Sequence, residues 1–390
     1  MACAGRYSED PRRAIRLNTS SPLPLWRGQE RNQGSLDRQF YLDLARRAVR
    51  MPVGTDLMMH EEPEPDKIRN DGIALGRVIE KAARCWRTPL AVPLMDLRLE
   101  KIDLLGLAGV PEDKADTFHF SAPLDDAALA RLTGEQPEAM CAGSTARNQA
   151  LAYIRTVPDL VAVGMAIGPF SLATRLMADP ISAGAMAGSG VEENESDEVR
   201  LLWQCIRIAE AAVLRSVRSQ VASGARAIMI CEPAACTAYI SPRQLKSGSN
   251  VFERLVMEPN LRVKAALDEA GCDLIFHNCG ELIDAMVQAF AARLHPVILS
   301  LGSSRKLWED AGFAPADVVL YGNLPSKSFY SDGAMPLEEV ARRTRELVDR
   351  MAACGHPHIV GSECDVLFVP HAQETIWRKV AALMGRPLER

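Results

Sequence analysis

Apolar residues recur along the chain in short runs, and most neighbouring runs are separated by a stretch with a helical pattern. Several runs are apolar at every position rather than at alternate positions, which is typical of parallel strands that are buried on both faces. Eight such runs lie at 51–59, 90–95, 160–165, 227–230, 273–276, 296–300, 318–321 and 358–360.

The stretches between the runs carry apolar residues at three- and four-residue spacing, which is typical of amphipathic helices. The stretch that begins at residue 198 should end at Ala222, because Ser223 and Gly224 follow and glycine is favoured just after the last residue of a helix. The four stretches are 71–86, 198–222, 337–354 and 373–384.

Eight strands that alternate with helices predict a (β/α)8 TIM barrel, and an open doubly wound sheet is the alternative. The first strand-to-helix turn has no G-x-G-x-x-G string, which disfavours a nucleotide-binding Rossmann fold. Residues 1–40 are polar and rich in Arg, Ser and Pro, so we interpret them as an N-terminal arm. We expect residues 41–390 to form a single barrel domain, with a helical insert near 100–150.

The composition narrows the class of protein. The chain has 390 residues, of which 47% are hydrophobic and 24% are charged, as is ordinary for a soluble globular enzyme. A net charge of −5 does not favour nucleic acid or an anionic membrane as a partner. No apolar run approaches the roughly 18 residues of a membrane span, and the N-terminus shows no signal-peptide pattern. We therefore expect a cytoplasmic protein whose ten cysteines are reduced and free to bind metal or to pack in the core.

The C-terminal ends of the strands hold the active site in such barrels, so the residues that follow the runs are the most informative. His277 and Cys279 follow the fifth run, and Cys364 follows the eighth, 85 positions after Cys279. One imidazole and two thiolates favour zinc over magnesium or calcium, and three protein ligands leave a fourth position open for chemistry. The alternative interpretation is a core histidine with two buried cysteines.

Other polar residues follow the remaining runs. Glu232 and Asp96 are candidate catalytic acids or substrate anchors, although each could instead form an ion pair with a neighbouring loop. His60 and Asn323 are weaker candidates for substrate binding. Cys231 also follows a run, and we expect it to be a small core residue.

Three segments, in order, resemble the uroporphyrinogen decarboxylase superfamily. IGPFSLA at 167–173 resembles that family's G-x-P-F-T-L-A, AYISP at 238–242 resembles its L-S-P string, and YGNLP at 321–325 resembles its Q-G-N-L-D-P. The resemblance covers essentially residues 41–390. It implies a TIM barrel and makes Tyr239 and Asn323 candidates for substrate binding.

Within that superfamily, His277, Cys279 and Cys364 resemble the zinc site of the cobamide-dependent methyltransferases, such as the methylcobamide:coenzyme M methyltransferases. The decarboxylases lack this set, and their R-Q-A-G-R-Y signature is missing from the first run, which ends LMMHE at 57–61. Asp96, however, stands where the decarboxylases carry their catalytic aspartate.

The resemblance implies a zinc-dependent transfer of a methyl group between a corrinoid (cobalamin) and a small-molecule thiol or tetrahydrofolate acceptor. The chain has no D-x-H-x-x-G corrinoid-binding string, since DGIALG at 71–76 has Ile in place of His and lies on a predicted helix. We therefore expect a separate corrinoid protein as partner. The alternatives are a metal-independent decarboxylase and a non-catalytic zinc-storage or corrinoid-protein-binding module.

Overall fold

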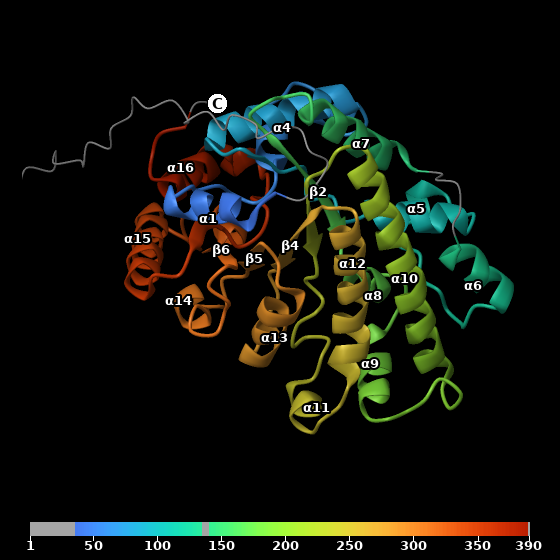
Figure 1. Cartoon of the computed structure of the whole chain (residues 1–390). Helices are drawn as coiled ribbons and strands as arrows, with labels where there is room; N and C mark the ends of the chain where they lie inside the picture. Colours follow the sequence, from blue (N-terminus) through green and yellow to red (C-terminus); the bar gives the residue numbers. More distant parts are fainter. Residues whose placement is uncertain (1–35, 135–139, 389–390) are drawn as a thin grey trace, which may run out of the picture.

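The computed structural model describes residues 36–134 and 140–388 (Figure 1). Most of the expected N-terminal arm therefore lies outside the described residues. The rest of it is already folded, because α1 (Arg38–Arg46) begins within it and Leu36 is buried. The Leu36 backbone N–H donates to the Asp273 carboxylate at 3.0 Å, which ties this segment to the start of a central strand.

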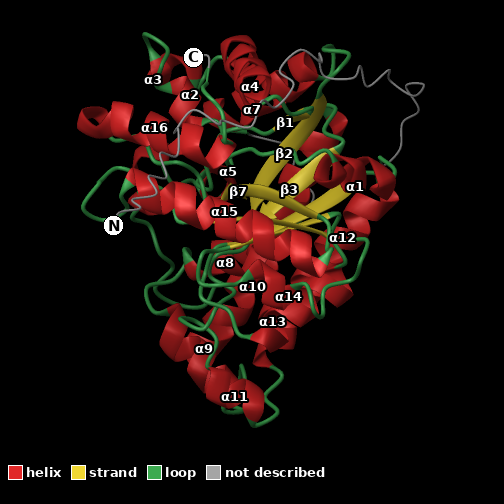
Figure 2. Ribbon diagram, turned by 90° about the vertical axis from the view of Figure 1, so that its left-hand side faces the viewer, coloured by secondary structure: helices red, strands yellow, loops and turns green. Residues whose placement is uncertain are grey.

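Seven parallel strands form one sheet in the order of the sequence, with helices packed around it (Figures 1 and 2). The parallel α/β architecture that the apolar runs predict is confirmed. Each of these seven strands starts within two residues of the start of its apolar run, because a continuous apolar segment is stable only where both faces are covered. The strands are β1 (Leu90–Ala91), β2 (Val161–Ile167), β3 (Ala227–Cys231), β4 (Asp273–Asn278), β5 (Ile298–Leu301), β6 (Val319–Leu324) and β7 (His358–Ser362).

The first predicted strand, 51–59, is wrong in its second half, which forms helix α2 (Asp56–Met59). Its first half runs parallel to β7 through isolated bridges, and the Met51 N–H donates to the Val360 carbonyl at 3.1 Å. Gly54 has φ +77°, a left-handed conformation that turns the chain out of the extended path before α2. Within residues 36–134 and 140–388, the sheet therefore has seven strands instead of the eight expected.

The second predicted strand is also shorter than its apolar run, because β1 contains only two residues. Pro93 lacks the N–H that a continued ladder would need. The chain beyond Ala91 consequently leaves β2, with which it pairs only at Leu90 and Ala91.

All four predicted helices are confirmed as α4 (Gly72–Trp86), α10 (Asp197–Ala222), α15 (Leu337–Cys354) and α16 (Gln373–Met384). Asp71 caps α4 by accepting from the N–H groups of Ile73 and Ala74, so the DGIALG string is a helix start, as expected. The segment expected as a helical insert contains α5 (Leu99–Leu107), η1 (Glu112–Lys114), α6 (Asp126–Thr133) and α7 (Ala142–Ile154).

Shorter helices complete the structure. Helices α9 (Pro180–Gly188) and α11 (Pro242–Lys246) project beyond the sheet and lie together at one end of the molecule (Figure 2), where the Gln244 side chain donates to the Ala185 carbonyl at 2.7 Å. No helix in the described part of the chain is long and apolar enough to cross a membrane. The remaining elements are α3 (Pro65–Ile68), α8 (Pro169–Thr174), η2 (Glu253–Met257), α12 (Glu258–Glu269), α13 (Asp284–Ala289), η3 (Phe290–Leu294), α14 (Leu307–Asp310), η4 (Ser326–Ser328) and η5 (Pro370–Ala372).

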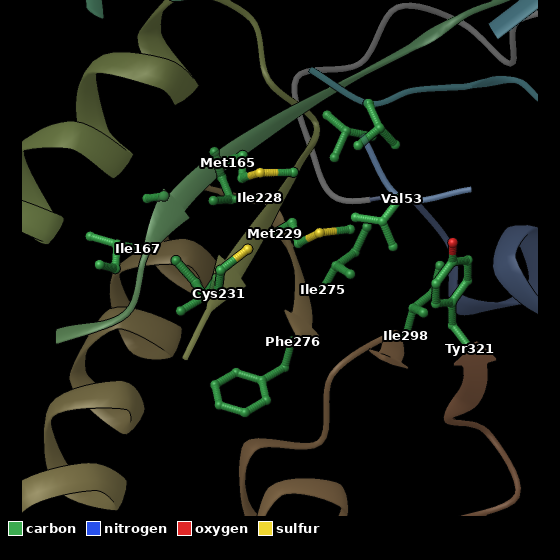
Figure 3. Packing of buried hydrophobic residues seen from close by; sticks show 14 of the residues in the cluster. Val53, Met165, Ile167, Ile228, Met229, Cys231, Ile275, Phe276, Ile298 and Tyr321 are labelled. Atoms are coloured by element: carbon green, nitrogen blue, oxygen red, sulfur yellow. The ribbon is translucent and has the colours of Figure 1, made fainter. Parts of the chain in front are cut away.

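The concave side of the sheet is a packed core. Met229, Ile275 and Ile298 point into it from neighbouring strands, whereas Phe276 points away from it (Figure 3) and packs on Phe290 of η3. The space left between these interior side chains is about 10 Å³, roughly what a single water molecule needs. Chemistry is therefore confined to the ends of the strands.

Candidate metal centre

Three residues from two distant strand ends meet above the core. His277 lies near the end of β4, Cys279 follows β4 directly, and Cys364 lies two residues after β7. Their ligand atoms all lie within 4.8 Å of one another, and the two Sγ atoms are 3.8 Å apart. Strands β5 and β6 separate β4 from β7 in the sheet, so the curl of the sheet brings the two ends together.

The His277 side chain points into the concave side, because His277 pairs in register with Ser300 of β5, which also lines the interior. The imidazole is only 1% exposed, and its Nδ1 lies 2.8 Å from Ser300 Oγ. The other ring nitrogen, Nε2, is buried and has no hydrogen-bond partner among the described residues. A buried polar atom without a partner costs free energy unless a ligand satisfies it.

The pKa values of the two thiols are shifted in opposite directions. A hydrogen bond from Cys364 lowers the pKa of the Cys279 thiol well below its ordinary value, and His277 and Lys327 act in the same direction. The pKa of Cys364 is raised in turn, chiefly because its proton is held by Cys279. A thiolate is the form in which cysteine binds metal, so the site is electrostatically prepared for a cation.

Sequence reasoning missed two residues of this centre. Lys327, on η4, places its Nζ 3.9 Å from Cys279 Sγ, and the two cysteines raise its pKa although burial opposes this. Ser300 orients the imidazole. The only sequence signal for Ser300 is a polar residue within an apolar run, and Lys327 carries no signal because its position depends on the loop after β6.

Glu232 follows β3 and is completely buried. Its carboxylate accepts from the backbone N–H groups of Phe170 at 2.8 Å and Ser171 at 3.3 Å, and from the Asn260 amide at 3.5 Å. Burial raises its pKa to about 7, although these hydrogen bonds oppose the shift. A Cβ atom on Gly168 would lie 1.5 Å from Oε2. The structure thus joins the Glu232 carboxylate to α8 and α12, whereas the Glu232 backbone N–H donates to the His277 carbonyl at 2.8 Å.

Asp96 lies beyond β1 and makes a two-pronged ion pair with Arg98, with N–O distances of 2.9 and 2.8 Å. Burial favours its neutral form, but the Arg98 hydrogen bonds prevail and the pKa of Asp96 is lowered. The preceding residue, Met95, places its Sδ 3.7 Å from Cys364 Sγ. Asp96 is therefore an ionised carboxylate next in sequence to Met95, which contacts the candidate metal ligand Cys364.

Two of the three candidates for substrate binding lie among neighbouring loops. His60 stacks on Phe368 with ring centroids 3.9 Å apart. The Asn323 amide donates to the carbonyls of Gly302 and Arg305, both at 2.8 Å, and so holds the loop after β5 in place.

Tyr239, the third candidate, lies in the loop between β3 and α11. It packs edge-on against Phe170 of α8, with centroids 6.2 Å apart and an interplanar angle of 88°. Tyr239 therefore packs on α8, the helix whose backbone N–H groups donate to the Glu232 carboxylate. The structure does not bring any of these three residues into the cluster of ligand atoms.

The donor set fits zinc. Within the described residues, His277, Cys279 and Cys364 form the one group of three or more potential ligands whose ligand atoms lie this close together. The set contains soft sulfur and imidazole nitrogen without a carboxylate, which disfavours magnesium and calcium. When Ser300 accepts from Nδ1–H, Nε2 carries the lone pair that a metal ligand needs and has no other hydrogen-bond partner among the described residues.

The sequence model of the uroporphyrinogen decarboxylase (URO-D) family matches residues 125–383, and the chain belongs to this family. A comparison with curated proteins found no match. Among solved structures, the fold is similar to that of a methyltransferase from Methanosarcina mazei, with a TM-score of 0.59 and 15% identity over 90% of this chain and 98% of that one. At this identity the likeness shows the fold alone.

A more distant likeness is to a putative vitamin-B12 independent methionine synthase from Listeria monocytogenes. The TM-score is 0.43 and the identity is 12%, over 91% of this chain and 98% of that one.

Proposed function

We propose that the protein is a zinc-dependent methyltransferase that moves a methyl group between a corrinoid, carried by a partner protein, and a thiol or tetrahydrofolate acceptor. The observation that carries the proposal is the buried, partnerless Nε2 of His277 beside the sulfurs of Cys279 and Cys364. The similar fold of a methyltransferase from Methanosarcina mazei supports the reaction class.

His277, Cys279 and Cys364 would hold the metal. Zinc supplies Lewis acidity that lowers the pKa of a bound thiol, so that the acceptor sulfur is a thiolate at neutral pH. Ser300 fixes the ring of His277, and Lys327 balances the negative charge of the two protein thiolates. Asp96, whose neighbour Met95 contacts Cys364, would position the acceptor, whereas we assign to Glu232 the role of holding α8.

The corrinoid would arrive on another protein. The string DGIALG at 71–76, which has the ends of a corrinoid-binding motif, is the capped start of α4 and forms no such loop. The proposal treats residues 41–390 as one (β/α)8 barrel, with the segment at Arg50–Val53 as a partly formed first strand. It also places the protein in the cytoplasm, where the two thiol ligands stay reduced.

Metal analysis of the purified protein tests the proposal. We expect about one zinc ion per chain, lost on the double change Cys279→Ala and Cys364→Ala. Cys354→Ser, which changes an exposed cysteine, is the matched control and should keep its zinc. Absence of zinc from the unaltered protein, or full zinc in the double variant, would contradict the metal centre.

Methyl transfer from free methylcobalamin tests the reaction separately. Loss of the methylcobalamin absorbance is followed with a panel of thiols and with tetrahydrofolate. We expect transfer to at least one acceptor, abolished in the double cysteine variant. Bound zinc without transfer to any acceptor would support a zinc-storage or docking module instead.

A metal-independent decarboxylase is the second candidate. Asp96 favours it, because this carboxylate is ionised and stands where the decarboxylases of the family carry their catalytic aspartate. Decarboxylation of a tetrapyrrole carboxylate that survives chelation and the double cysteine change, but not Asp96→Asn, would favour this candidate.

A further inference from the structure

The two cysteines of the candidate metal centre are also placed to bond to each other. Their Sγ atoms are 3.8 Å apart, although the two residues are 85 positions apart in the chain. A disulfide bond needs a distance of about 2.05 Å between the two sulfurs. Cys279 and Cys364 both lie just beyond the ends of their strands, so rotation of the two side chains can supply the remaining approach of less than about 2 Å.

Solvent reaches this pair more readily than it reaches the cysteines of the core. Cys279 and Cys364 are half-buried, whereas Cys231 and Cys236 are buried. The exposed residue Lys327 places its ammonium nitrogen 3.9 Å from Cys279 Sγ. Reactive cysteines lie in such partly exposed surroundings beside a cation, which stabilises the negative charge of the attacking sulfur. A small oxidant from solvent should therefore react at Cys279.

We propose that Cys279 and Cys364 are an oxidation site, and that hydrogen peroxide converts them to a reversible disulfide when no metal is bound. The disulfide removes both sulfur ligands of the candidate metal centre, so the oxidised chain cannot take up metal until a thiol reductant restores the two thiols. This oxidation requires neither bound zinc nor methyl transfer.

The oxidation takes place in two steps. The Cys279 sulfur attacks one oxygen of hydrogen peroxide, the O–O bond breaks, and the products are a sulfenic acid on Cys279 and one water molecule. The Cys364 sulfur then attacks the Cys279 sulfur, the S–O bond breaks, and a second water molecule leaves with the proton of the Cys364 thiol. The two sulfurs together lose two electrons, which reduce the peroxide to water.

Two other sulfur atoms lie near the pair. Met95 Sδ is 3.7 Å from Cys364 Sγ, but a thioether has no thiol hydrogen to lose and cannot form a disulfide. Cys236 lies beside the residue that follows Cys279, because a Cβ atom on Gly280 would be 3.0 Å from Cys236 Sγ. Cys236 is therefore the rival partner for an oxidised Cys279.

Thiol counting on the full chain tests the proposal. The protein is treated with a chelator and then with about one equivalent of hydrogen peroxide, and its thiols are titrated with Ellman's reagent after denaturation. We expect the loss of two of the ten thiols, reversed by dithiothreitol. No loss of thiols, or a loss that dithiothreitol does not reverse, would overturn the proposal.

Mass spectrometry of the unreduced tryptic digest identifies the pair. Trypsin leaves Cys279 in peptide 265–293 and Cys364 in peptide 351–378, which also contains Cys354. The digest is therefore made from Cys354→Ser, a change of an exposed cysteine outside the centre, so that a cross-link between these two peptides must involve Cys364.

A second variant identifies the other half of the cross-link. Peptide 265–293 also contains Cys272, which is buried. We expect Cys279→Ser, made in the Cys354→Ser background, to abolish the cross-link and to slow the loss of thiols at least about tenfold. A cross-link that survives this change, or one that joins Cys279 to Cys236, would overturn the proposal.

Zinc separates this proposal from the proposed function. If the three ligands bind zinc, addition of zinc before the peroxide should slow disulfide formation at least about tenfold, because the sulfur lone pairs are then bound to the metal. A disulfide that forms equally fast with zinc would contradict the metal centre and still support the oxidation site. Bound zinc without any disulfide in the metal-free protein would support the metal centre and overturn the oxidation site.

Discussion

The hydroxyl of Ser300 on β5 fixes the imidazole of His277 on the neighbouring strand, with 2.8 Å between Oγ and Nδ1. The two residues are register partners in the sheet, so the contact follows from strand pairing alone. It leaves Nε2 as the ring nitrogen without a hydrogen-bond partner among the described residues.

Removal of this hydroxyl tests its role. We expect Ser300→Ala to weaken zinc binding by about 10- to 100-fold, because the His277 ring loses the hydrogen bond that orients it. Competition with a chromogenic chelator measures the affinity. Ser247→Ala, on the surface after α11, should leave the affinity unchanged, and an equally unchanged affinity in Ser300→Ala would contradict the orienting role.

Glu232 should make stability depend on pH. Burial raises its folded-state pKa from 4.5 to about 7, so the folded state binds the proton more tightly than the unfolded state. The contribution of this group to stability is therefore present at low pH and is lost as the pH rises from about 4.5 to about 7. A shift of this size corresponds to at most about 3 kcal/mol.

Glu232→Gln removes the titration while keeping an oxygen that accepts from α8. We expect its free energy of unfolding, relative to the unaltered protein, to rise by up to about 3 kcal/mol between pH 5 and pH 8. Urea unfolding at both values measures this difference, in which other titrating groups cancel. A difference that stays constant with pH would show that Glu232 keeps an ordinary pKa.

Gly168 and Glu232 should be energetically coupled. Gly168 has an ordinary helical-entry φ of −74°, so alanine meets no backbone strain there, but its Cβ would lie 1.5 Å from Glu232 Oε2. We expect Gly168→Ala to destabilise the protein by about 1–3 kcal/mol through overpacking.

A double-mutant cycle with Glu232→Ala separates this clash from other causes. In the Glu232→Ala background, Gly168→Ala should cost less by about 0.5–3 kcal/mol, because the clashing atom is gone. Additive effects of the two changes, measured by urea unfolding, would be inconsistent with direct contact.

Lys379 of α16 supports the loop that carries Lys327. Its buried ammonium group donates to the Phe329 carbonyl and contacts the Asp332 carboxylate, both at 2.9 Å. Lys379→Met leaves that carbonyl without its donor, so we expect a loss of about 1–3 kcal/mol and faster proteolysis within 326–335. The exposed Lys306→Met serves as control, and equal proteolysis rates in both variants would refute the supporting role.

Much of the fold could be predicted because a strand that is buried on both faces of a parallel sheet is apolar at every position. Amphipathic helices could be predicted because their apolar residues recur at three- and four-residue spacing. These rules placed β2, β3 and the long helix α10 within a few residues. They failed at 51–59 and 90–95, where Gly54 and Pro93 end extended structure inside an apolar run. An apolar run indicates that a segment is buried, whereas the backbone conformation decides whether that buried segment is a strand.

The candidate site divides in the same way. The sequence alone determined which residues could bind metal, since His277, Cys279 and Cys364 each follow a run and their side-chain chemistry is intrinsic. Only the tertiary structure decided that they meet, because the curl of the sheet is a property of all seven strands together. It also decided that Lys327 and Ser300 join them and that Glu232 turns toward α8, since each of these outcomes depends on contacts between segments far apart in the chain.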